Sequence, residues 1–422
     1  MSKIHKNSSL QIFFCPASDY LNQYNETGSH GQISYQFLKH LAAKPIVKSL
    51  FGAVIMSLDV DPIKKTTIVP LLKKEKGGAL TDYDSLYFYI VSYFKYVGSA
   101  QYRDAQIVHH IIPFALGRSF NLFFLFKDRK KKYIIGPIIG PHINTQITAD
   151  EEYVFSEKKS LTIRFKEFIY QSSKTVLLGL FGKVLHWLSL RTIRNADIVF
   201  FSDNHAFNYH KKYLSKNQKG IILDTGIDTA IFKPQVKKVN EKKDKLLRVL
   251  FVGRLTKRKG CEYLIRAICE AKKLKKDITI HCDILGVGPL RDELVSLAKE
   301  LGVSKNITFL GGVKSNEDIV KNYYKTDIVC LPALSETFTV TKEAMACGKP
   351  VIVTDICSNA ERVKPGINGF VVPPQDPGAI AKVLVKAAGE SELIKKLSLN
   401  ALKTRPLYDW SNILDSYLKH IA

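Results

Sequence analysis

Short runs of β-branched and aromatic residues alternate with amphipathic stretches along the second half of the chain. The runs predict strands, and the stretches between them, where apolar residues recur every three or four positions, predict helices. The six predicted strands cover 247–253, 278–286, 307–312, 327–332, 350–355 and 369–373. The predicted helices lie near 260–273, 289–302, 316–325, 341–347 and 376–388. This alternation is typical of a doubly wound parallel sheet of the Rossmann kind.

The first half has a noisier pattern that still predicts an α/β domain. Its strand-like runs are 10–16, 53–60, 66–72, 106–112, 133–139, 197–203 and 220–226. Between the halves, the stretch 233–245 is polar and nearly free of large apolar groups, as expected of a linker. We therefore predict two Rossmann-like domains at 1–232 and 247–405, a linker at 233–246, and a C-terminal helix within 406–422, with packing on the first domain as one option. A ligand cleft is expected between the carboxyl ends of the two sheets.

Composition restricts the classes of partner and compartment. The 63 Lys and Arg residues exceed the 39 Asp and Glu residues, which gives a net charge of +24 and favours polyanions: nucleic acid, anionic lipid or phosphorylated small molecules. The seven cysteines form no CxxC pair, which fits a reducing cytoplasm rather than a zinc or disulfide protein. The stretch Val176–Leu190 is too short and too polar to span a membrane. A core-facing amphipathic helix is favoured there over one that lies peripherally on the inner face of a membrane.

The first strand of the second domain runs directly into the segment GRLTKRKG, at 253–260. Arg254 and Lys259 would leave the end of the strand together and point toward the expected cleft. A guanidinium fork, an ammonium group and a backbone turn at Gly253 are what a phosphate group needs. The alternative for this segment taken alone is an ordinary basic surface loop.

A second candidate segment, SETFTVTKEAMACGKPVI, follows the predicted strand at 327–332. A helix is predicted to start near Val340, and the loop amides of Phe338, Thr339 and Val340 would be unpaired donors at its N-terminus, which is a ready site for a diphosphate. Glu343 in the first turns could accept two vicinal hydroxyls of a ribose, while Glu336 in the loop could reach a sugar ring. The alternatives are a helix-dipole partner for Glu343 and an exposed loop acid for Glu336.

Several segments of the second half together resemble the nucleotide-binding domain of glycosyltransferase family 4, a group of retaining transferases with the GT-B fold. The segments are FVGRLTKRKGCEYLIRAI, LGVGPLRDELVSLAKELGVSKNITFLGGV, LPALSETFTVTKEAMACGKPVIVTD and INGFVVPPQDPGAIAKVL. They extend from Leu250 to Leu384 in the order and spacing of the family. Looser matches to the family's acceptor domain occur at 104–119, 133–142, 196–206 and 226–234.

The resemblance implies a role for each matching residue of the donor site. Arg254 and Lys259 would hold the diphosphate of the donor, Glu343 its ribose, and Glu336 the transferred sugar. One departure from the family pattern concerns the two glutamates, which are separated by six residues instead of the usual seven. If the loop is not simply one residue shorter, Ser335 takes the position of the first carboxylate.

The resemblance also implies roles for two glycines and a histidine. Gly288, in the segment GVGP, would lie along the base region of the donor, and Gly31, in the segment TGSHGQIS, would face the phosphates from the first domain. His109 or His110 would lie near the reacting carbon; successive strand side chains point to opposite faces, and we favour His110. A buried structural histidine is the alternative. The family's usual glycine pairs are replaced by His30-Gly31 and by residues 357–359, which are Cys, Ser and Asn.

The implied activity is a metal-independent, retaining hexosyl transfer from a nucleoside-diphosphate sugar to a saccharide or lipid-linked saccharide acceptor, as in the synthesis of surface polysaccharide or glycolipid. No cofactor or metal is expected. An anionic membrane surface is a further candidate partner. The closest alternative is a sugar-nucleotide epimerase on the same fold. A metal site at Asp59-Val60-Asp61 and a nucleic-acid-binding protein are disfavoured, since charge is the only support for nucleic acid.

Overall fold

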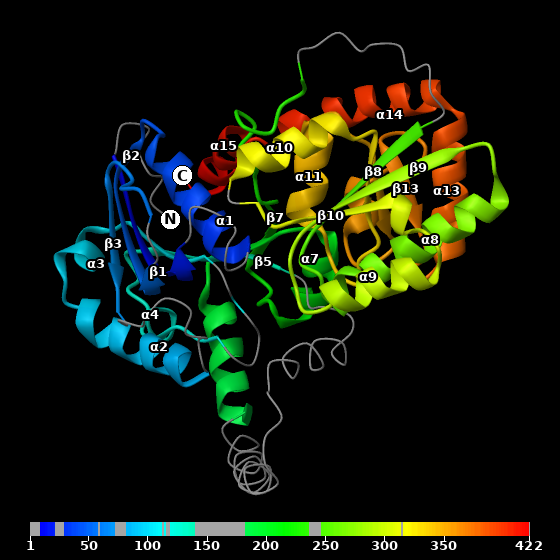
Figure 1. Cartoon of the computed structure of the whole chain (residues 1–422). Coiled ribbons are helices and arrows are strands. Elements are labelled where there is room, and N and C mark those ends of the chain that lie inside the picture. Colours follow the sequence, from blue (N-terminus) through cyan, green and yellow to red (C-terminus); the bar gives the residue numbers. More distant parts are fainter. Residues whose placement is uncertain are drawn as a thin grey trace, which may run out of the picture. The chain divides into compact units, whose positions relative to one another are not determined.

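The computed structural model describes residues 9–21, 29–57, 60–71, 82–111, 114, 119–139, 182–235, 246–313 and 315–421. These residues form two compact units (Figure 1). The first unit holds the described residues of Met1–Pro141, Ser156–Gly226 and Trp410–Ala422, and the second holds those of Ile227–Asp409.

The first unit is a parallel sheet of seven strands in the order β3-β2-β1-β4-β5-β6-β7. The strands are β1 (Leu10–Leu21), β2 (Val47–Ser57), β3 (Thr66–Pro70), β4 (Ile107–His110), β5 (Lys132–Ile138), β6 (Ile198–Phe201) and β7 (Lys219–Ile222). Its helices are α1 (Ser29–Ala42), α2 (Asp82–Tyr96), α3 (Ala100–Asp104), α4 (Leu122–Leu125), α7 (Asn204–His210), the 3-10 turn η1 (Lys211–Tyr213), α15 (Trp410–Ile421) and an unlabelled helix at 182–195. All seven predicted strands are confirmed, although β2 begins six residues earlier than predicted, because Val47 and Leu50 pair with β1 and are buried.

Two apolar clusters cover the two faces of this first sheet. On one face, α1 and α15 pack against the strands, and α15 contributes an apolar stripe that includes Trp410 and Tyr417. On the other face, α2, α4 and the helix at 182–195 cover a cluster rich in phenylalanine. The predicted stretch Val176–Leu190 is helical from 182 onward and faces that core through Leu185 and Leu188; its earlier residues lie outside the described part.

The second unit is a parallel sheet of six strands in the order β10-β9-β8-β11-β12-β13. The strands are β8 (Leu246–Val252), β9 (Thr279–Leu285), β10 (Ile307–Gly311), β11 (Ile328–Leu331), β12 (Val351–Thr354) and β13 (Gly369–Val372). The helices are α8 (Cys261–Leu274), α9 (Arg291–Glu300), α10 (Asn316–Lys325), α11 (Phe338–Ala346), α12 (Asn359–Arg362), α13 (Pro377–Gly389) and α14 (Ser391–Lys403), with 3-10 turns η2 (Lys257–Lys259), η3 (Ser304–Asn306) and η4 (Arg405–Tyr408). The predicted doubly wound fold is therefore confirmed, with all six strands in the predicted places.

The order in which strands are added across the second sheet reverses between β8 and β11, which are parallel neighbours. The chain winds outward from β8 through β9 to β10 and then returns to the other side of β8 at β11. Helices α8, α9 and α13 cover one face of this sheet, and α10 and α11 cover the other. A doubly wound sheet binds its ligands outside the carboxyl ends of the strands at such a reversal.

The boundary between the units differs from the predicted one. The second unit begins at Ile227, not after a linker at 233–246, because Ile227 and Phe232 are buried in its apolar cluster. The Ile227 amide donates a hydrogen bond to the Tyr408 carbonyl, which joins the start of this unit to its end. The C-terminal helix accordingly starts at Trp410 and belongs to the first unit. Residues 236–245 of the predicted linker lie outside the described part.

Candidate functional site

A pocket opens in the second unit between the ends of β8 and β11, where the strand order of the sheet reverses. Its lining residues are Phe251, Val252, Gly253, Lys259, Leu331, Ala333, Thr337 and Val340. They come from the ends of β8 and β11, the loop after β8 and the start of α11. The pocket therefore lies where the topology of the sheet favours a ligand.

The loop at 253–260 is fixed to its neighbours on both sides. The Leu255 amide donates to the Val287 carbonyl at 2.9 Å, and the Leu334 amide donates to the Arg258 carbonyl at 2.8 Å. Gly260 adopts a left-handed conformation at φ 66°, and any side chain there would collide with the Pro332 carbonyl oxygen. The backbone is thereby held in place between the ends of β9 and β11.

The two predicted cations of this loop have different surroundings. Lys259 is half-buried and lines the pocket together with Gly253, Thr337 and Val340. Arg254 is exposed and is not among the residues that line it. Lys259 is thus the cation that the described structure places at the pocket, and Arg254 leaves the same loop five residues earlier.

Helix α11 points its first turn at this pocket. It begins at Phe338, so Phe338, Thr339 and Val340 are its first three residues, and within the described part no side chain caps it. The hydroxyl of the N-cap residue, Thr337, is instead engaged with Thr341 and Asn359. The first amides of the helix consequently keep the donor capacity that an anion can use.

Asn359 supports this helix start and was missed by the sequence analysis. Its side-chain oxygen accepts from the Thr337 amide at 3.1 Å and from the Thr337 hydroxyl at 3.2 Å. Its side-chain nitrogen donates to the Ser335 carbonyl at 3.4 Å. One buried side chain therefore holds both residues that flank Glu336. The only sequence signal was that Asn359 stands in the segment where the family usually has paired glycines.

The two predicted carboxylates are both buried. Glu336 lies in the loop between β11 and α11 and is not the exposed acid that the alternative interpretation expected. Glu343 lies in the second turn of α11, too far along for a partner of the helix N-terminus. The Tyr323 hydroxyl on α10 donates to a Glu343 carboxyl oxygen at 3.3 Å, and burial raises the pKa of Glu343 to about 8.

The two other predicted glycines, Gly288 and Gly31, lie in different units. A side chain at Gly288 would collide with the backbone of Leu255, so this glycine lets the turn after β9 pack against the loop after β8. Gly31 is buried in the first turn of α1, in the first unit.

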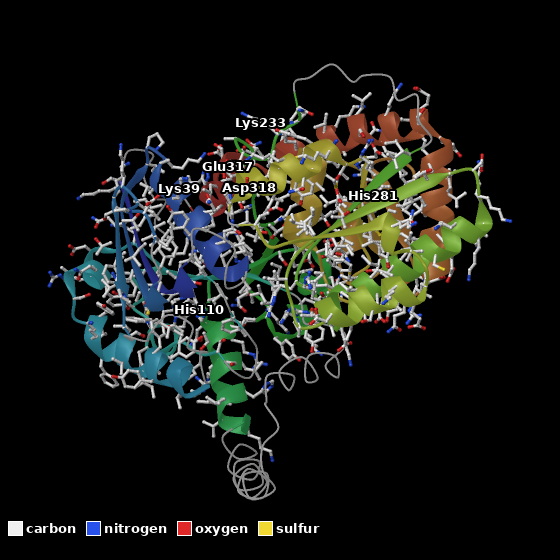
Figure 2. The ribbon with its side chains drawn as sticks, viewed as in Figure 1. Lys39, His110, Lys233, His281, Glu317 and Asp318 are labelled. Carbon is white, nitrogen blue, oxygen red and sulfur yellow. The ribbon has the colours of Figure 1, made fainter. Side chains whose placement is uncertain are left out.

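The two histidines of β4 are both fully buried in the first unit, where Figure 2 labels His110. His109 has a structural environment: its Nε2 lies 2.7 Å from the Gly136 carbonyl, and its Nδ1 lies 2.9 Å from the Tyr417 hydroxyl of α15. Burial lowers the pKa of His109 to about 3, so the ring is neutral, donates to Gly136 and accepts from Tyr417. His110, at the end of the strand, lies 3.4 Å from the Asn121 side-chain amide.

Two further sequence predictions concern metal binding and membranes. Asp59 of the Asp59-Val60-Asp61 triplet lies outside the described residues, and Asp61 is exposed. Throughout the described ranges, each helix is too short or too polar to cross a bilayer.

Comparison with known sequences finds a similarity within the second unit. Residues 232–404 match the family model described as glycosyl transferases group 1. These residues lie within the second unit, which is therefore similar in sequence to group 1 glycosyl transferases. An uncharacterized glycosyltransferase of Methanocaldococcus jannaschii is 39% identical over 168 residues, which cover 39% of this chain and 42% of that protein. A D-inositol 3-phosphate glycosyltransferase of Corynebacterium urealyticum is 28% identical over 235 residues, covering 52% and 55%. The matched segments thus span about half the length of these relatives.

Comparison with solved structures extends the likeness in fold to nearly the whole chain. Sucrose-phosphate synthase from Thermosynechococcus elongatus superposes with a TM-score of 0.66 at 18% identity, covering 98% of both chains. HepE from Anabaena, solved in complex with UDP, gives a TM-score of 0.64 at 13% identity, covering 97% of this chain and 99% of that one. The predicted GT-B fold class, with two Rossmann-like units, is confirmed.

Proposed function

We propose that the protein is a retaining glycosyltransferase that moves a sugar from a nucleoside-diphosphate sugar to an acceptor hydroxyl. The observation that carries the proposal is the pocket between the ends of β8 and β11, where Lys259 and the uncapped start of α11 line one recess. The match of residues 232–404 to the group 1 glycosyl transferases supports it.

The chemical difficulty of the reaction is the negative charge that develops on the departing nucleoside diphosphate. The Lys259 ammonium and the first amides of α11 would stabilise that charge as the bond to the anomeric carbon breaks. Because these donors are held in place before reaction, they need no reorganisation, and losing one such donor typically costs about 3 kcal/mol of transition-state stabilisation. Arg254, exposed on the same loop, would reach the diphosphate from outside the pocket. With these cations present, the reaction needs no divalent metal.

The carboxyl groups and the first unit would supply the other contacts. Glu343 would hold the ribose of the donor and Glu336 the transferred sugar, with His110 near the reacting carbon. The acceptor would be a saccharide or lipid-linked saccharide, as in surface polysaccharide or glycolipid synthesis. HepE, which shares the fold, has been solved with UDP and glucose, so UDP-glucose is the first hexose donor to test.

The test is a thermal-shift panel with UDP, GDP, ADP and CDP, each with and without EDTA. A nucleotide at 100 times its dissociation constant should add about 2.7 kcal/mol to the stability of the folded protein. Lys259→Ala should weaken binding by roughly 10- to 100-fold, as expected for the loss of a charge-assisted hydrogen bond. The matched control is Lys257→Ala, which removes an exposed cation of the same loop that does not line the pocket.

Two outcomes would contradict the proposal. Equal loss of nucleotide binding in Lys257→Ala and Lys259→Ala would point to general attraction by positive charge. Stabilisation that disappears with EDTA would contradict the metal-independent site. With the stabilising nucleotide known, product analysis of the matching sugar nucleotide separates a transferase, which glycosylates an added acceptor, from an epimerase, which alters the donor alone.

A further inference from the structure

The first unit has an apolar surface that faces solvent on the outer side of α2. The inner side of this helix packs into the core through Phe88, Tyr89 and Tyr96. The outer side is also apolar, with large exposed side chains at Tyr87, Ile90 and Phe94, followed by Val97 directly after the helix. These four positions follow one another at intervals of three and four residues and form a single stripe. A helix that is apolar on both sides is typical of one with a partner on each side.

Two neighbouring segments carry further exposed apolar side chains. Phe126, directly after α4, has its ring 5.5 Å from that of Tyr93 in α2. The Asn121 amide at the start of α4 donates to the Thr192 hydroxyl at 3.0 Å, which holds the helix at 182–195 beside α4. That helix exposes Val184 and Trp187.

We call the exposed apolar side chains of these three neighbouring segments the apolar face; it consists of Tyr87, Ile90, Phe94, Val97, Phe126, Val184 and Trp187. It holds seven of the 17 large hydrophobic side chains that are exposed among the described residues. Such side chains are ordinary when scattered singly, whereas a cluster of them marks an interaction site.

Positive charges border the apolar face. The exposed cations on the same three segments are Lys95, Arg129, Lys130, Lys183, Arg191 and Arg194. The described ranges 82–98, 119–132 and 182–195 contain nine Lys and Arg residues and three acidic residues. The acids are Asp82 and Asp84 at the start of α2, and Asp128, which is half-buried and accepts from the Lys130 amide. The Arg191 guanidinium lies over the Trp187 ring, 4.9 Å from its centroid. The partner of this surface must therefore accept both apolar side chains and an excess of positive charge.

We propose that the apolar face docks on an anionic membrane surface. Aromatic and aliphatic side chains would enter the boundary between headgroups and acyl chains, while the bordering cations pair with lipid phosphates. A second copy of the chain fits this surface less well, because a two-fold contact would bring two sets of these cations together. The proposal goes beyond the proposed function and does not depend on it, since none of its residues belongs to the nucleotide pocket.

The test is co-sedimentation of the full chain with vesicles of phosphatidylcholine alone and of phosphatidylcholine mixed with phosphatidylglycerol. The wild-type protein should bind the anionic vesicles, and binding should weaken at raised salt. The double variant Phe94→Ser, Trp187→Ser should bind roughly 30-fold more weakly, from about five- to sixfold for each side chain that is partly buried in lipid. These side chains are 72% and 53% exposed, so their replacement leaves the core intact.

The matched control is the double variant Leu399→Ser, Leu407→Ser, which changes two side chains of the second unit that are 62% and 67% exposed. It should bind vesicles like the wild type. Arg191→Gln should weaken vesicle binding about fivefold, because one cation near an anionic membrane surface strengthens binding by about that factor. Equal binding to neutral vesicles, or equal losses in both double variants, would overturn the proposal. So would a wild-type dimer in light scattering that becomes monomeric in Phe94→Ser, Trp187→Ser, since the face would then join two copies.

Discussion

Replacing Glu343 with glutamine should remove a strong pH dependence from the stability of the second unit. The side chain is 6% exposed, and its burial raises the pKa from an ordinary value of 4.5 to about 8. Between these pH values the unfolded chain releases a proton that the folded state keeps. The contribution of Glu343 is therefore most favourable below about pH 4.5 and is lost as pH rises through the folded pKa.

The size of the effect follows from the shift. Each pH unit inside this window changes the unfolding free energy by about 1.4 kcal/mol, so raising the pH from about 5 to about 7.5 should cost the wild type about 3 kcal/mol. Glutamine has no proton to lose and can still accept the hydrogen bond from Tyr323. For a unit of this size, 3 kcal/mol corresponds to roughly 6–12 °C in melting temperature.

Scanning calorimetry of the wild type, Glu343→Gln and the exposed control Glu300→Gln over this pH range would measure the difference. The melting temperature of the second unit should fall more steeply with pH in the wild type and in the control than in Glu343→Gln. Parallel pH profiles of the wild type and Glu343→Gln would refute the reasoning, because they would mean that Glu343 is ionised in the folded protein at neutral pH.

Two further variants test a contact that holds a pocket residue of the second unit and a contact of a buried histidine in the first unit. Asn359→Ala should destabilise the second unit by about 1–3 kcal/mol in calorimetry, because the Thr337 amide loses its acceptor. The same variant should show weaker nucleotide binding in the thermal-shift assay. Asn359→Asp keeps an acceptor, so it should lose less stability and less nucleotide binding. Tyr417→Phe should destabilise the first unit by a similar amount, because the His109 Nδ1 is left buried with no donor, while the thermal shift caused by the nucleotide stays unchanged. A reduced nucleotide shift in Tyr417→Phe would contradict the assignment of His109 to a structural role.

The strands could be predicted from the sequence because they are buried on both faces. A parallel strand between two helical layers is apolar at nearly every position, as in β11 and β12, whose four residues each are all buried. Part of the pocket in the second unit was predictable for a related reason. Its residues lie at the ends of two such strands or in the loops that follow them, as Gly253 follows β8, so their place at the end of the sheet could be predicted once the strands were found.

Contacts between distant positions could not be predicted in the same way. Asn359 reaches Thr337 across 22 positions, and Tyr323 reaches Glu343 across 20, so no local pattern of the chain indicates either pair. The boundary at Ile227 could not be predicted from the sequence either. A short polar segment looks like a linker from its composition, whereas the start of the second unit is decided by where Ile227 and Phe232 are buried.

The position of α15 makes the first unit discontinuous along the chain. Its apolar stripe fills a surface of the first unit, where Trp410 and Tyr417 pack against Phe37 and where any side chain at Gly226 would collide with Trp410. During synthesis, this helix leaves the ribosome only after the whole second unit. The apolar surface that α15 covers therefore stays exposed on the first sheet while the second unit is synthesised. A fragment that stops before Trp410 should be prone to aggregate.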